Sequence, residues 1–288
     1  TFFELLISGK NEAYGRQVSQ AVFSEIDRIE NLFSRFNPCS EIGQINRLKP
    51  GQSLMVGIEI FECIKIASWV QSQTQGAFDI NIGSAAKSGR NHMPESKKSG
   101  ADTNILKQID LIQTPRGYMV EIPGRKEMDE KSLVDLDLGG IGKGYALDKT
   151  LEILSDWSIT NALIHAGTST ALAIGSPANQ DLKKKGWPVG IAGSCDFEQA
   201  QKEFILRNRA LSGSGTEVKG KHIFDPRTGR PANGHLAAWA SHPSAAVSDA
   251  LSTAFMVMST EEVRAFCEKN PEVWALVVVH SKTFKTFN

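Results

Sequence analysis

The chain has 288 residues, of which 41% are hydrophobic and 22% are charged, a composition typical of a folded globular protein. This length allows one large domain or two moderate ones with an ample core. Lys plus Arg and Asp plus Glu both number 32, so the formal net charge is zero. No overall basic field exists to attract nucleic acid or an anionic membrane, and we expect neither as a partner.

The cysteine spacing and the apolar segments argue against further classes of protein. The four cysteines form no CxxC pair, which argues against a zinc ribbon or a redox dithiol. Cys63 and Cys267 fall in helical apolar patterns and are predicted core residues, and one disulfide stays open. No run of about 18 apolar residues occurs, so we expect no transmembrane segment. The chain begins at Thr1; we expect a periplasmic protein or a membrane-anchored lipoprotein if a signal was removed, and a cytoplasmic protein otherwise.

The first third of the chain is predicted to hold a strand over 1–8 and two helices. Residues 12–33 carry apolar side chains at three- and four-residue spacing, which predicts an amphipathic helix. Ser40 follows an Asn-Pro break and is predicted to cap a short helical turn. After a helix over 58–74, Asp79 and Asn81 share one face of an extended segment, which fits either a site or turn chemistry. Residues 84–102 are polar and are predicted to form an exposed loop.

A glycine-rich stretch at 134–148 is the most informative segment. Strands are expected at 110–113 and 117–122, and an alternating strand then enters a turn with four glycines and Lys143. A helix is predicted over 145–154. Glycines let a backbone approach a ligand closely, and a lysine at a helix N-terminus suits phosphate. The alternative is a tight strand-to-helix connection with Lys143 in solvent.

The second half of the chain is predicted to be mostly sheet. Strands are expected within 161–175, 187–192, 203–206 and 273–280, and residues 210–215 are interpreted as a small polar turn. His222 and Asp225 precede a Pro–Gly turn, where a histidine is either structural or catalytic.

A predicted helix near residue 248 carries a second candidate site. Ser248 is a plausible N-cap, and Asp249 and Thr253 are four residues apart, so their oxygens share a helix face. Such oxygens suit Mg²⁺. The alternative is that Asp249 balances the helix dipole while Thr253 faces the core.

Taken together and in order, these motifs resemble the ApbE family, the FAD:protein FMN transferases. The resemblance covers essentially the whole chain. It rests on the segments 34–36, 40–46, 76–79, 137–148, 212–213, 222–229 and 248–254. We therefore expect an α+β fold in a single domain over 1–288, with a mixed, largely antiparallel sheet flanked by helices.

The resemblance implies a Mg²⁺-dependent enzyme that takes FAD as its substrate. Members of this family cleave the FAD pyrophosphate and pass FMN to a Ser or Thr hydroxyl of an acceptor protein, whereas some hydrolyse FAD to FMN and AMP. Carried over by motif, the metal ligands are the Gly142 carbonyl, Asp249 and Thr253, and Asp249 also counts as catalytic. His222 is the candidate base. The expected contacts to the flavin nucleotide are Lys143, Asp79, Gly140, Tyr145, Ser212, Gly213 and His222.

Three features depart from the family pattern. Gly142 stands where the family usually has Ala, and Thr168 stands where an Asp or Asn is common. The segment 84–102 differs from the usual helical continuation. Two alternatives therefore stay open beside transfer: an FAD pyrophosphatase, and a flavin-binding protein without turnover.

Overall fold

The computed structural model describes residues 1–82, 108–124, 134–178, 185–191, 203–215, 223–280 and 283–288. The predicted exposed loop at 84–102, Cys195 and His222 lie outside these ranges. Among the described helices, none combines the length and apolar character needed to cross a membrane.

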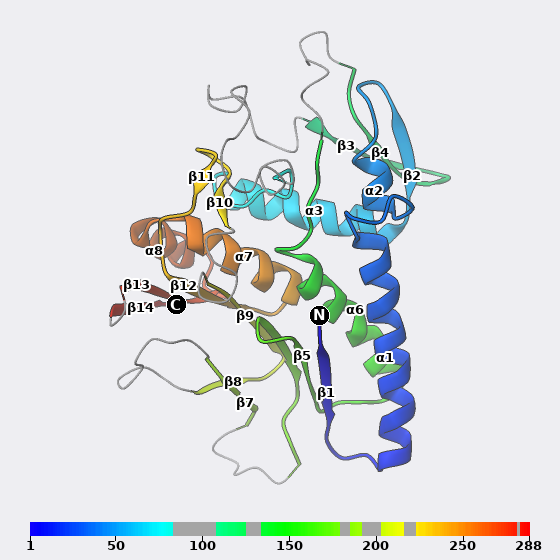
Figure 1. Ribbon diagram of the computed structural model, residues 1–288. Coiled ribbons are helices and arrows are strands. Elements are labelled where there is room, and N and C mark those ends of the chain that lie inside the picture. The colour runs from blue at the N-terminus through cyan, green and yellow to red at the C-terminus, as the bar shows by residue number, and fades with distance from the viewer. Residues whose placement is uncertain (83–107, 125–133, 179–184, 192–202, 216–222, 281–282) are drawn as a thin grey trace.

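A seven-stranded sheet forms the base of the fold (Figure 1). Its strand order is β1-β5-β6-β9-β12-β13-β14, and every neighbouring pair is antiparallel. The predicted α+β class with a largely antiparallel sheet is confirmed. The strands span Phe3–Ile7, Ala162–Ala166, Thr170–Ile174, Arg209–Gly215, Ala237–His242, Trp274–His280 and Thr283–Phe287.

Helices α1, α6, α7 and α8 cover one face of this sheet, and a smaller layer lies beyond them (Figure 1). The helices are α1 (Glu12–Phe33), α2 (Glu41–Ile45), α3 (Ile58–Gln73), α6 (Gly142–Asp156), α7 (Ala245–Val257) and α8 (Thr260–Lys269). The smaller layer holds α3 and a three-stranded sheet, order β2-β4-β3. The remaining strands are β2 (Ser53–Val56), β3 (Asp110–Thr114), β4 (Gly117–Glu121), β7 (Trp187–Gly190), β8 (Glu203–Leu206), β10 (Phe224–Asp225) and β11 (Arg230–Pro231).

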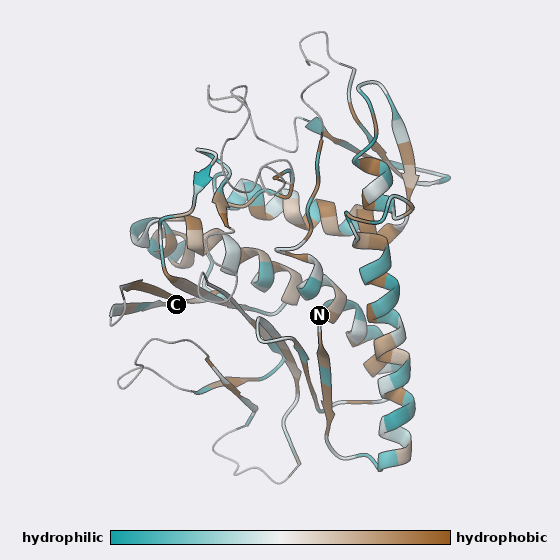
Figure 2. Ribbon diagram, in the orientation of Figure 1, coloured by the Kyte–Doolittle hydropathy of each residue, from teal (hydrophilic) through white to brown (hydrophobic). Residues whose placement is uncertain are grey.

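Helix α7 is the centre of the packing. Every residue of α7 except Thr253 is buried, so the helix is enclosed on all sides rather than amphipathic. The long helix α1 is different, because its apolar side faces the core and its other side is hydrophilic (Figure 2). The apolar residues whose spacing predicts that side are all buried: Val18, Val22, Ile26, Ile29 and Phe33. The one residue of α7 that reaches a surface is therefore a predicted site residue.

Two predicted helix starts are wrong. Helix α6 begins at Gly142 instead of Tyr145, so Lys143 lies in its first turn. Glycine is a poor helix former, but contacts with α7 override that preference here. Helix α7 begins at Ala245 with Ser244 as its N-cap, whose side chain accepts from the Val247 N–H at 3.3 Å. Ser248 instead donates to the Ala240 carbonyl at 2.7 Å.

The predicted polar turn at 210–215 is also wrong, because these residues form β9 in the middle of the large sheet. Their small side chains suit close packing against α7, and Ser214 bonds directly to Ser252 of that helix at 2.9 Å. A Cβ on Gly213 would lie 2.5 Å from Trp239 Nε1 on the neighbouring strand. Small and polar residues here reflect crowding rather than a turn.

Buried histidines make stability depend on pH. His235 is 6% exposed, with Nδ1 at 2.6 Å from the Phe255 carbonyl and Nε2 at 3.1 Å from Thr260 Oγ1. Burial lowers the pKa of His235, and also that of His242, below the ordinary 6.5. The unfolded chain therefore binds more protons than the folded chain just below pH 6.5.

We expect these histidines to make their full contribution to the free energy of unfolding above pH 6.5. That contribution falls as the pH drops below this value. Each histidine contributes at most about 1.4 kcal/mol per pH unit. Urea denaturation at about pH 7.5 and about pH 5.5 measures the change. The slope is expected to be shallower in His235→Gln; an unchanged slope in that variant would contradict the assignment. Because burial raises the pKa of Asp148, which acts in the opposite direction, the variant comparison is the decisive one.

Candidate active site at the meeting of helices α6 and α7

Asp249 lies at the centre of the candidate site. It projects from α7, is 2% exposed, and its carboxylate meets three groups from elsewhere in the chain. The Gly144 N–H donates to Oδ2 at 3.1 Å, and the Thr170 hydroxyl donates to Oδ1 at 3.3 Å. Lys143 Nζ lies 3.3 Å from Oδ1 and 3.2 Å from Oδ2. The buried negative charge is thus compensated by one ammonium group and two neutral donors.

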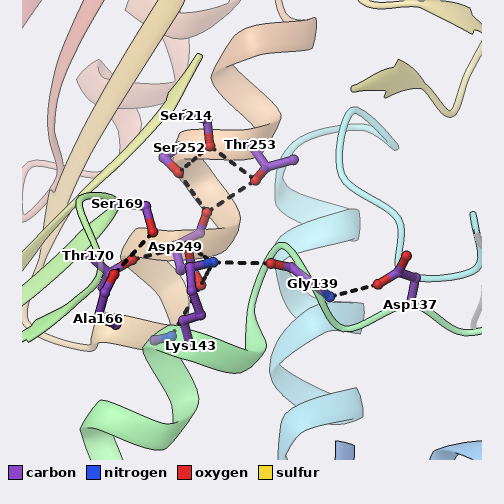
Figure 3. Close-up of polar contacts among 11 residues, drawn as sticks. Asp137, Gly139, Lys143, Ala166, Ser169, Thr170, Ser214, Asp249, Ser252 and Thr253 are labelled. Atoms are coloured by element: carbon purple, nitrogen blue, oxygen red, sulfur yellow. Dashed lines mark hydrogen bonds and ion pairs between the residues drawn. The ribbon is translucent and has the colours of Figure 1, made fainter. Parts of the chain in front are cut away.

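The glycine-rich turn approaches Asp249 through Lys143 (Figure 3). Besides contacting the carboxylate, the ammonium group donates to the Gly139 carbonyl at 3.1 Å. The Lys143 side chain is 25% exposed, whereas that of Asp249 is 3% exposed. The lysine therefore connects the buried carboxylate with the surface of the turn.

Hydroxyl groups surround the next turn of α7. Thr253 Oγ1 lies 3.4 Å from the Asp249 carbonyl and 3.4 Å from Ser214 Oγ (Figure 3). Ser252 donates to the same carbonyl at 2.8 Å. A Cβ on Gly140 would lie 3.2 Å from Thr253 Oγ1, so the turn rests directly against this hydroxyl. The structure thus brings Gly140, Lys143, Asp249 and Thr253 together, although about a hundred residues separate the turn from α7.

Each of the two helices carries an aspartate whose carboxylate accepts hydrogen bonds from the N-terminus of the other helix. Asp148 of α6 accepts from the Ser244 hydroxyl at 2.6 Å and from the N–H groups of Ala245 and Ala246 at 2.7 and 3.0 Å. Asp249 of α7 in turn accepts from Gly144 in the first turn of α6. The N-terminus that Asp249 compensates is therefore that of α6, not that of its own helix.

The close approach of α6 and α7 depends on Gly144. A Cβ at this position would lie 2.1 Å from the Ala245 carbonyl oxygen and 2.8 Å from the Ala246 Cα. These are backbone atoms, which cannot move aside as a flexible side chain can. Gly142 is less restricted, since a Cβ there would lie 3.2 Å from the edge of the Phe33 ring.

Two other predicted contact residues lie on β9, beside Asp249. Ser212 pairs with Thr170 across the sheet and shares the helix-facing side of its strand with Ser214. It is completely buried, and within the described part of the chain its hydroxyl has no hydrogen-bond partner. Gly213, the next residue, faces Trp239. Ser212 is therefore an orphaned polar group at the side of the site.

Tyr145 and Asp79 have hydrogen-bond partners within the protein. The Tyr145 hydroxyl donates to Glu62 of α3 at 2.8 Å, and burial followed by this bond raises the pKa of the phenol. Asp79 is 7% exposed and accepts from the Asn81 N–H at 2.8 Å, which is turn chemistry. Asn81 in turn accepts from the Asp135 N–H at 2.8 Å. These two predicted nucleotide contacts thus hold neighbouring segments in the structure.

Thr170 and Asp148 are members of the assembly that the sequence analysis did not single out for a role. Thr170 occupies an ordinary strand position, and only the sheet register places it beside Asp249. His222, the candidate base, falls just before the described residue Ile223 and outside the described ranges. Its role stays a prediction.

The comparisons with known proteins assign the family. The family model described as "ApbE family" matches residues 1–277. The chain therefore belongs to the ApbE family.

Individual relatives are distant in sequence but similar along their length. The FAD:protein FMN transferase of Buchnera aphidicola is 24% identical over 285 residues, covering 94% of this chain and 81% of the relative. That of Escherichia coli is 23% identical over 307 residues, covering 100% and 84%. The apo flavinyl transferase ApbE of Pseudomonas stutzeri superposes with a TM-score of 0.77 at 18% identity, covering 100% of this chain and 96% of that chain. The ApbE protein of Thermotoga maritima gives 0.77 at 24% identity, covering 100% and 97%. These structures share the fold of this chain.

Proposed function

We propose that this chain is an FAD:protein FMN transferase that uses Mg²⁺ and a Ser or Thr hydroxyl as the acceptor. The observation that carries the proposal is the contact of Lys143 with buried Asp249 at 3.2 Å, at the N-terminus of α6. A cation, a carboxylate and a helix N-terminus gathered beside a glycine-rich turn suit a pyrophosphate substrate. The names of the curated relatives in this family support the choice of FAD and of a protein acceptor.

The donor atoms at Asp249 fit a hard divalent cation. Besides the carboxylate they include the Thr170 hydroxyl at Oδ1 and, one helical turn away, the Thr253 hydroxyl, while the turn offers the Gly139 carbonyl to Lys143. Within the described residues, no three His, Cys, Asp or Glu side chains gather at one point. Mg²⁺ commonly keeps several waters and binds through one or two carboxylates plus substrate phosphates, so a single carboxylate is sufficient. In this proposal Asp249, Thr253 and the Gly142 carbonyl hold the ion, which would neutralise phosphate charge.

The transfer itself needs positioning more than covalent chemistry from the protein. The acceptor oxygen forms a bond to the FMN phosphorus, the pyrophosphate bond to the AMP phosphate breaks, and AMP leaves. Lys143, which is partly exposed and already beside the turn, would stabilise the phosphate charge. In the proposal His222 takes the proton of the acceptor hydroxyl, a task suited to a neutral imidazole near physiological pH.

One assay distinguishes the proposed transfer from its two alternatives. The purified chain is incubated with FAD, Mg²⁺ and an acceptor peptide containing Ser or Thr, alongside the same peptide with Ala at that position. We expect covalent flavin fluorescence on the Ser or Thr peptide alone, equimolar AMP, and loss of both when Mg²⁺ is chelated.

The other outcomes overturn the proposal in different ways. Release of FMN and AMP without labelling of any acceptor identifies an FAD pyrophosphatase, in which water replaces the hydroxyl. FAD that remains intact with Mg²⁺ present identifies a flavin-binding protein without turnover. Labelling that persists in the presence of chelator would overturn the Mg²⁺ requirement and leave the transferase function standing.

A further inference from the structure

A buried arginine lies behind the glycine-rich turn. Arg35 follows the end of α1, and its side chain is only 6% exposed. Its guanidinium group pairs with two carboxylates of the segment that enters the turn. Nη1 lies 2.6 Å from Asp137 Oδ2, and Nη2 lies 3.2 Å from Asp135 Oδ1. The planar guanidinium can hold two carboxylates in fixed directions, which a lysine ammonium does less well.

Asp137 uses its second carboxylate oxygen for the turn itself. Oδ1 accepts from the Gly139 N–H at 2.9 Å, while Oδ2 holds Arg35. The turn is exposed at Gly139, although Leu138 and Ile141 on either side are buried at 3% and 0% exposure. Between these anchors the two glycines have no side chains to pack, and glycine accepts many backbone angles at little cost. Polar contacts therefore hold the two peptide groups that meet at Gly139. Asp137 accepts from the N–H of the first, whose Leu138 carbonyl accepts from the N–H groups of Ile141 and Gly142 at 3.0 and 2.7 Å, and the carbonyl of the second accepts from Lys143.

These contacts form a continuous path to the candidate site (Figure 3). Asp137 holds the Gly139 N–H, the Gly139 carbonyl accepts from Lys143 Nζ at 3.1 Å, and Nζ contacts Asp249 at 3.2 Å. Among the described residues, the ion pairs of Arg35 are with Asp135 and Asp137, which places it at the start of this path. A change in the carboxylate direction at Asp137 would move the Gly139 N–H and, with it, the following peptide group, whose carbonyl accepts from the lysine.

We propose that Arg35 and Asp137 are positioning residues that hold the backbone of Gly139 and, through the carbonyl of this residue, the place of Lys143. The proposal rests on the proposed transferase function for its kinetic consequence, but not for its structural one. Removing one partner of a buried ion pair leaves the other charge uncompensated and is strongly destabilising, so the stability of each variant is measured beside its kinetics.

The test compares two arginines of the same region. Arg28 of α1 also bridges two carboxylates, at 2.7 Å from Glu25 Oε1 and 2.5 Å from Glu59 Oε1, but none of its ion pairs reaches the turn. We expect Arg35→Met to lower kcat for flavin transfer by roughly 10- to 100-fold, because a small misplacement of Lys143 would have an effect of that size. The KM for FAD should change much less, and Arg28→Met should leave both constants near wild type.

A second measurement does not depend on turnover. Amide hydrogen exchange at Gly139 is expected to be faster in Arg35→Met and in Asp137→Asn than in wild type, and unchanged in Arg28→Met. Arg35→Lys should restore part of the protection and part of kcat, which a merely structural loss would not predict. Asp137→Asn retains an acceptor of similar shape and guards against a variant that fails to fold.

The outcomes separate the two proposals. If wild type and Arg28→Met transfer flavin and Arg35→Met does so equally well, the positioning role is wrong and the transferase function stands. If wild type transfers no flavin, the transferase function is wrong and Gly139 exchange alone decides the positioning role. Exchange at Gly139 that is the same in all variants would overturn it.

Discussion

Replacing Gly144 with alanine is expected to destabilise the protein by about 3 kcal/mol or more, the upper range for inserting a group into a packed interior. The added Cβ would lie 2.1 Å from the Ala245 carbonyl oxygen, so α6 and α7 would have to move apart. That movement would also lengthen the hydrogen bond that the Gly144 N–H donates to Asp249, now 3.1 Å. Urea or thermal denaturation followed by circular dichroism measures the loss.

The control is Gly142→Ala, two residues earlier in the same turn. Its Cβ would lie 3.2 Å from the Phe33 ring edge, which a small shift of that side chain relieves. We expect a change in stability below about 1 kcal/mol, since alanine also favours helix. Equal destabilisation by the two substitutions would show that the close approach at Ala245 is not the cause.

Replacing Asp249 with asparagine is expected to reduce Mg²⁺-dependent flavin transfer by at least about a thousandfold, because loss of a metal's charge stabilisation is a matter of several kcal/mol. Asparagine has nearly the same shape. Its single side-chain oxygen can still accept from the Gly144 N–H, while its amide group can donate to the Thr170 hydroxyl oxygen, so the fold should survive. Steady-state kinetics and Mg²⁺ titration monitored by heat or by fluorescence measure the two losses separately.

Asp148→Asn provides the matched control for Asp249→Asn. Asp148 is also an aspartate on one of these helices that accepts from the N-terminus of the other. It binds the N-terminus of α7, whereas Lys143 pairs with Asp249, so the expected loss is in stability, about 1 kcal/mol as for a weakened helix cap, with little change in kcat. Undiminished turnover in Asp249→Asn would exclude the proposed metal site.

Elements defined by local patterns were predicted well from the sequence. The apolar spacing of α1 gives its bounds of Glu12–Phe33, and Ser40 caps α2 by accepting from the Gly43 N–H at 2.9 Å. Cys63 and Cys267 are buried, as their patterns predict. In each case the signal lies within a few residues of the feature that it predicts.

The errors arose where a distant contact decides the local structure. Ser248 is predicted as an N-cap, but the N–H groups at the start of α7 donate to Asp148, about a hundred residues earlier. The small polar run of β9 resembles a turn until Trp239 and α7 are placed against it. Glycines at the start of α6 disfavour helix locally and are needed for its contact with Ala245.

The candidate site was predictable only in part for the same reason. The spacing of Asp249 and Thr253 gives one shared helix face, and the family pattern links that face with Lys143. No local signal indicates that Thr170 reaches Asp249 or that Arg35 reaches Asp137, because these pairs are 79 and 102 residues apart. Their contacts follow from the sheet register and from the packing of α1.

The N-terminus of α7 is bound by Asp148 of α6, and the N-terminus of α6 is bound by Asp249 of α7. This reciprocal pairing has a consequence for how the site forms. Each helix starts with N–H groups whose negative partner belongs to the other, 97 residues away for Ala245 and 105 for Gly144. Neither half of the site is complete within its own neighbourhood, and closing so long a loop is entropically costly. The lysine and the carboxylate therefore come together only when the two helices dock.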